Sequence, residues 1–183
     1  MESDLRRRRN ALVVLWTLIL AKCFLLEYWV AEYAVPINST MYVWGLSLFM
    51  ASVATGVSFN LTRKERGPLD LSSPATRVWF GCAALVVLAM LGFWLGDAAA
   101  LNRLLSVIAG ILGFAYGGHY LYTRGSIFLY SAVGWLIASC LLFGEASQLA
   151  LFYFSMSLIL FSALSSLLVY SRPRLFKYLI FRE

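Results

Sequence analysis

The sequence has few charged residues and few side chains with catalytic or metal-binding chemistry. Only 13% of its 183 residues are charged, and it contains one histidine and three cysteines. Soluble domains carry about 25% charged residues. The cysteines (Cys23, Cys82 and Cys140) are scattered and form no CxxC pair, which argues against a disulfide framework, a redox motif and a thiolate metal site. Because metal sites need clustered ligands, we expect no metal and no other cofactor.

Enzyme signatures are missing as well. The sequence contains no HExxH, GxSxG or P-loop motif. The stretch Gly56-Val57-Ser58-Phe59 superficially resembles a serine-nucleophile motif but lacks the following glycine. We therefore expect a protein that is not an enzyme, and no motif in the chain identifies a family.

Apolar residues, in contrast, make up 61% of the chain, and the mean hydropathy is +0.78. This composition excludes a soluble globular protein, a disordered chain and a nucleic-acid binder. About 20 apolar residues cross a bilayer. The sequence therefore predicts an all-α polytopic integral membrane protein with a single transmembrane domain of six spans, arranged as three hairpins. The predicted spans are residues 11–34, 41–59, 77–96, 102–122, 126–143 and 149–170, with a polar loop at 60–76 and a basic interfacial tail at 171–183.

The basic residues indicate how the spans are oriented. Nearly all of the 15 Lys and Arg residues fall on the side of the membrane that holds both termini. The positive-inside rule places that side in the cytoplasm, and we expect a multi-pass protein of a bacterial inner membrane. Cations in the loop and the tail are expected to attract anionic lipid headgroups and to dock a soluble partner. The candidate docking residues are Arg63, Lys64, Arg66, Arg174 and Lys177.

The first span contains two charged residues at membrane depth. Lys22 lies near its midpoint, and Glu27 lies five residues further, about 7.5 Å along the helix. A charge at the centre of a span costs about 2.5–3.5 kcal/mol on insertion scales and marks a functional or partner-binding site. The two side chains are separated by about 140° around the helix, so at least one needs a partner from another span or another chain. Within the chain, Arg103 is a candidate partner for Glu27.

Small residues predict where the helices pack closely. In the fourth span, Ala109, Gly113 and Gly117 recur at four-residue spacing, which places this span at the centre of the bundle. Other spans offer shorter sets of small residues: Ser47, Ala51 and Thr55; Gly134 and Ala138; and Ser155, Ser162 and Ser166. His119, the single histidine, follows two glycines in the fourth span and is interpreted as a hydrogen-bonded structural residue or a proton relay.

Two functional hypotheses follow. The first is a non-catalytic integral membrane subunit that acts through assembly, as a homo-oligomer or with partner proteins, and docks partners on its basic cytoplasmic face. The alternative is a small-solute or ion transporter or channel in which Lys22, Glu27 and His119 line a polar cavity.

Overall fold

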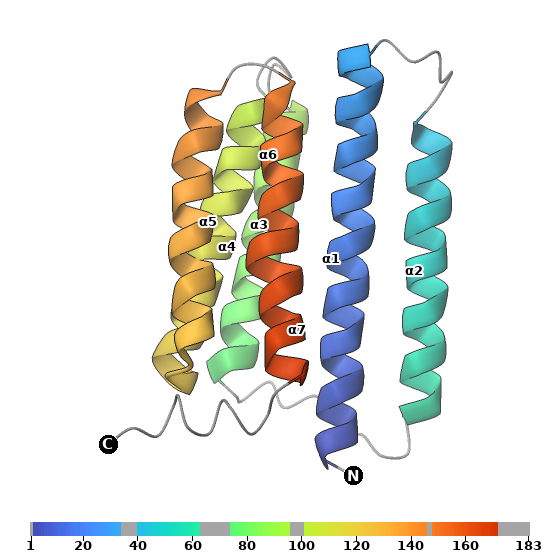
Figure 1. The fold of residues 1–183 in the computed structure, drawn as a ribbon, viewed down its shortest axis with the longest axis vertical. Helices are drawn as coiled ribbons and strands as arrows, with labels where there is room; N and C mark the ends of the chain where they lie inside the picture. The colour runs from blue at the N-terminus through green and yellow to red at the C-terminus, as the bar shows by residue number, and fades with distance from the viewer. Residues whose placement is uncertain (1, 34–39, 63–73, 96–100, 146–147, 172–183) are drawn as a thin grey trace.

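The computed structural model describes residues 2–33, 40–62, 74–95, 101–145 and 148–171, and these residues are all-helical, with no strand among them (Figure 1). Five of the described helices are long and apolar enough to cross a membrane, and a shorter apolar stretch covers Arg77–Gly92. The prediction of an all-α protein with long apolar helices, as in membrane proteins, is therefore confirmed.

The helix bounds lie close to the predicted spans. The helices are α1 (Glu2–Tyr33), α2 (Met41–Thr62), α3 (Pro74–Leu95), α4 (Leu101–Thr123), α5 (Ser126–Gly144) and α6 (Leu149–Ser157). A π-helical segment, Leu158–Ala163, continues α6 without a break into α7 (Leu164–Ser171).

Two helix ends correct the predicted polar loop. Residues 60–62 belong to α2 and residues 74–76 to α3, so they are helical. Pro74 suits the start of α3, because proline lacks only an N–H that has no intrahelical partner there. Similarly, α1 extends through the basic residues before the first apolar run.

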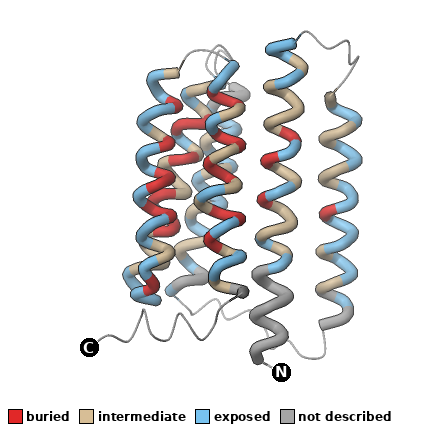
Figure 2. Tube along the Cα trace, in the orientation of Figure 1, coloured by how far each residue is buried: buried red, intermediate tan, exposed pale blue. Residues whose placement is uncertain are grey.

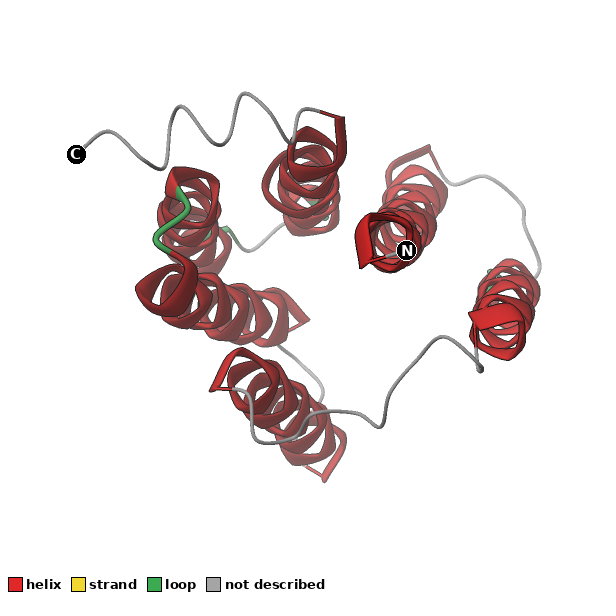
Figure 3. Cartoon of the chain, turned by 90° about the horizontal axis from the view of Figure 1, so that it is seen from below, coloured by secondary structure: helices red, strands yellow, loops and turns green. Residues whose placement is uncertain are grey.

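The helices follow an open arc when seen along their axes (Figure 3). α4 and α5 form the most extensive pair, α3 packs on α4, and the continuous α6–α7 helix packs on α5 and α4. α1 packs on α6 and α7, and the main contacts of α2 are with α1. The α1–α2 pair is therefore joined to the rest of the bundle through α1.

Burial is concentrated in the C-terminal half of the chain (Figure 2). Trp135 on α5 is fully buried and stacks its ring edge against Phe161 of the π-helical segment. Of the described residues of α2 only Ala51 is buried, and none of α3 is. Apolar helices in hydrocarbon gain no hydrophobic free energy from covering one another, so these outer helices keep exposed apolar faces.

Serine hydroxyls connect the helices of the core. Ser106 and Ser139 each donate a hydrogen bond to the other's backbone carbonyl, at 2.7 and 2.8 Å, and so join α4 to α5. Ser131 and Ser165 join α5 to α7 through hydroxyls 2.6 Å apart. Of the described residues, none has a buried side-chain nitrogen or oxygen without a partner. The serine face predicted for the last span included Ser166, but this residue is only half-buried, and the neighbouring Ser165 is buried in its place.

Gly134 provides a test of this packing. A Cβ atom at this position would clash with the Phe161 ring, whereas a Cβ atom at Gly45 on α2 would meet nothing within 4 Å. We expect Gly134→Ala to lower stability by about 1–3 kcal/mol because the ring must shift. Thermal unfolding in detergent checks this, with a fall of several degrees in the midpoint expected. Gly45→Ala is the matched control, and an equal effect of both substitutions would contradict the packing.

Candidate functional site

Among the described residues, three side-chain hydrogen bonds join α1 to α2 across the apolar region. Nearest the N-terminal end of α1, the Trp16 indole donates to Thr55 Oγ1 at 2.9 Å. Further along, Lys22 Nζ donates to Ser47 Oγ at 2.9 Å, and the Trp44 indole donates to Glu27 Oε1 at 2.8 Å. We call these six residues the α1–α2 polar strip.

The spacing of small and polar residues on α2 explains why the strip forms. Trp44, Ser47, Ala51 and Thr55 recur every three or four residues and therefore share one face of the helix. Ala51 is 1% exposed and allows the two helices to approach closely at the middle of that face. Because the helices are antiparallel, partners that come later in α1 meet residues that come earlier in α2.

Lys22 is the midpoint of the apolar span Ala11–Tyr33. Its side chain is exposed, and it reaches around α1 to the hydroxyl of Ser47. An ammonium has three N–H donors and no acceptor. Among the described residues, Ser47 is the acceptor recorded for it. Of the two sources of a partner that the sequence left open, another span or another chain, the structure shows a neutral hydroxyl on α2.

Glu27 is half-buried and accepts the hydrogen bond of Trp44. The Trp44 ring is held in turn by an edge-to-face contact with Phe24, with ring centroids 5.2 Å apart. The recorded partner of Glu27 is thus an indole of α2, where the sequence had suggested Arg103. Glu27 and Lys22 each bond to α2, at positions one helical turn apart.

His119 lies elsewhere in the bundle. The Trp79 indole of α3 donates to its Nδ1 at 3.4 Å, and its ring packs edge-to-face on Phe128 of α5 at 4.4 Å. His119 therefore sits where α3, α4 and α5 meet, while Lys22 and Glu27 bond to α2. The structure does not bring the three residues together as the transport hypothesis requires.

The small-residue stripe of α4 faces α5. Ala109 is fully buried, and a Cβ atom on Gly113 would lie 2.9 Å from the Leu136 side chain. A Cβ atom on Gly117 would lie 3.8 Å from that of Ala132. These positions hold the most extensive helix pair of the fold together.

The predicted docking cations Arg63, Lys64, Arg66, Arg174 and Lys177 lie outside the described residues.

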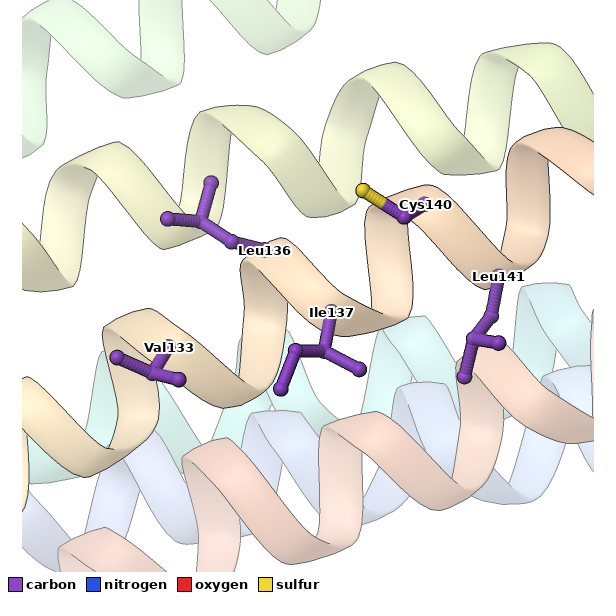
Figure 4. A pocket seen from close by; sticks show the side chains of 5 residues that line it. All are labelled: Val133, Leu136, Ile137, Cys140 and Leu141. Carbon is purple, nitrogen blue, oxygen red and sulfur yellow. The ribbon is translucent and has the colours of Figure 1, made fainter.

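A shallow depression on α5 is apolar. It is lined by Val133, Leu136, Ile137, Cys140 and Leu141, all from this one helix (Figure 4). None of these side chains carries a charge, so the depression suits hydrocarbon and offers no recognition of a polar solute.

No group of three or more His, Cys, Asp and Glu side chains that could hold a metal ion is found within the described part of the chain. Comparison of the chain with protein-family models, curated proteins and solved structures finds no match. The function must therefore be argued from the site.

Sequence reasoning missed Trp16 and Trp44 as partners, and it treated Ser47 and Thr55 only as small packing residues. A signal was present, because aligning the first two spans as an antiparallel hairpin places Trp44 and Ser47 at the depth of Glu27 and Lys22. The rotation of each helix, which decides whether these side chains face one another, required the structure.

The bond between Glu27 and Trp44 can be measured by a double-mutant cycle. We expect Glu27→Leu and Trp44→Phe to show a coupling energy of about 0.6–1.7 kcal/mol, the range for interhelical hydrogen bonds in membranes. Unfolding in mixed micelles gives the four free energies. The control pair is Glu32→Leu with Trp44→Phe, because Glu32 is exposed on the same helix and its effects should be additive within about 0.5 kcal/mol. Equal coupling in both cycles would contradict the assigned contact.

Proposed function

We propose that the chain is a non-catalytic integral membrane subunit that acts through assembly with itself or with partner proteins. The observation that supports this most is Lys22, an exposed ammonium at the midpoint of an apolar span. Within the part of the chain that the structure describes, its hydrogen-bond partner is a single hydroxyl, that of Ser47. Inserting a charged side chain into the membrane costs free energy, and such residues mark sites that bind a partner, a ligand or an ion. An exposed position supports a contact with another molecule in the membrane.

The proposed topology has six spans in three hairpins, with both termini in the cytoplasm of a bacterial cell. The length of the continuous helix from Leu149 to Ser171 supports counting it as one span. The basic residues concentrated on one side support the orientation.

The proposed cytoplasmic face includes Arg63, Lys64, Arg66, Arg174 and Lys177. Their charge supports attraction to anionic headgroups, worth about 1 kcal/mol per nearby cation, and electrostatic docking of a soluble partner.

The competing proposal is transport of a small solute or ion along Lys22, Glu27 and His119. A shared path requires polar groups that face a common space. The position of His119 between α3 and α5, and the bonds of Lys22 and Glu27 to α2, support assembly over this alternative.

Purification from native membranes tests the proposal. We expect the chain, extracted in mild detergent and measured by light scattering with a correction for bound detergent, to have a mass well above its 20.5 kDa. The excess should correspond to further copies or to a partner present in fixed stoichiometry. A solitary monomer at every mild detergent tested would contradict assembly.

Proteoliposomes distinguish the competing proposal. The purified chain should give no proton or ion flux that depends on Lys22 or Glu27. Flux that is lost in Lys22→Ala and Glu27→Gln variants, with helix content and thermal midpoint unchanged, would favour transport instead.

A further inference from the structure

One face of α1 carries exposed side chains at intervals from Leu18 to Tyr33. Leu18, Lys22, Trp29 and Tyr33 are all exposed, and the three uncharged members of this set are 44%, 60% and 68% exposed. At about 100° per residue these four positions fall within roughly 60° of one another around the helix. We call this set the Lys22 face. It is apolar and aromatic apart from the one ammonium.

Two other sides of α1 contact neighbouring helices. Glu27 and Trp16 bond to α2. On another side, the Ala21 carbonyl accepts a hydrogen bond from Ser155 at 2.7 Å, and the Phe24 ring contacts Phe154. Leu18, Trp29 and Tyr33 therefore point away from both neighbouring helices. Lys22 shares their face, and its side chain reaches from there to Ser47 of α2.

The Lys22 ammonium keeps unused hydrogen-bonding capacity on this face. It has three donors, and among the described residues it has one recorded acceptor, Ser47 Oγ. Hydrocarbon supplies no acceptor. Lipid headgroups lie beyond the ends of the span, roughly 16 Å from Lys22 in either direction along the helix, which is farther than a lysine side chain reaches.

We propose that a transmembrane helix of a second protein, carrying an aspartate or glutamate at mid-membrane depth, docks on the Lys22 face and bonds to the Lys22 ammonium through its carboxylate. This inference rests on the proposed function and names the chemistry of the partner. A carboxylate offers several acceptor positions and neutralises the charge. The apolar residues on either side of Lys22 supply van der Waals contact for the rest of the helix.

A second copy of the chain does not fit this face. Two copies inserted with the same orientation bring residues of equal depth together across a two-fold interface, so the two Lys22 ammoniums would oppose each other. Glu27 of a second copy would lie about 7.5 Å further along the helix, and it faces α2, where Trp44 bonds to it.

The experiment uses defined transmembrane peptides as probes. The purified full-length chain carries a donor dye on its terminal amine and is reconstituted in phosphatidylcholine vesicles at pH 8. Acceptor-labelled Leu/Ala peptides, long enough to span the bilayer, carry either Glu or Leu at the central position. We expect the Glu peptide to associate about tenfold more tightly than the Leu peptide, as measured by energy transfer against peptide-to-lipid ratio.

Variants of the chain test whether the preference for the Glu peptide over the Leu peptide depends on Lys22. Lys22→Met should abolish the difference between the two peptides, and Lys22→Arg should keep it. Leu18→Met is the matched control, since it changes the same face one turn away without changing charge, and it should bind as the native chain does. Equal binding of both peptides to the native chain, or a preference that survives Lys22→Met, would overturn the inference.

The two proposals fail differently. Equal binding of the two peptides would contradict the proposal of an acidic partner helix. The chain could still assemble through another surface, and a mass well above that of the monomer in mild detergent would show that it does. A solitary monomer extracted from native membranes would contradict the proposed function, which is assembly.

Discussion

The structure depends on one constraint, which is that polar groups at membrane depth must find their partners within protein because hydrocarbon supplies none. The hydrogen bond from Lys22 Nζ to Ser47 Oγ shows the constraint most directly. Together with the Glu27–Trp44 and Trp16–Thr55 bonds, it holds α2, whose apolar surface gains nothing from leaving lipid, against α1 in one register. Besides these bonds, the pair is held by close contact around Ala51 and by the edge-to-face contact of Phe24 with Trp44.

The same constraint shapes the rest of the bundle with different residues. In the C-terminal helices the polar groups are serines, which bond across α4, α5 and α7 while the glycines allow close approach. The π-helical segment brings Ser162 to the Trp135 indole, which donates to it at 3.2 Å. Neutral hydroxyls suffice there because no charge needs neutralising. The α1–α2 pair differs, since it contains the Lys22 ammonium, and the partner that the described residues supply, Ser47, is uncharged.

The sequence predicted much of the fold and little of the site. Apolar run length gave the helices to within a few residues, because spanning a bilayer imposes a minimum length. The predicted polar loop at 60–76 was too long, because residues at both of its ends are helical. A helix does not stop where the hydrocarbon ends, since its backbone hydrogen bonds continue into polar residues. The position of Lys22 and Glu27 within an apolar span was enough to identify them as charged residues that need partners. Their partners Ser47 and Trp44 depended on helix rotation, which no single-span pattern contains. His119 was grouped with them by chemistry, yet packing between α3 and α5 separates it.

The depth and surroundings of residue 22 test the central claim most directly. A spin label at position 22, in a chain whose Cys23, Cys82 and Cys140 are replaced by alanine, reports collisions with oxygen in lipid and with a water-soluble nickel complex. For the chain alone in bilayers, the account predicts a high oxygen collision rate and a low nickel rate at position 22. A label at position 20, turned away from the Lys22 face, should show a lower oxygen rate. A high nickel rate at position 22 would place this residue in water and contradict the account.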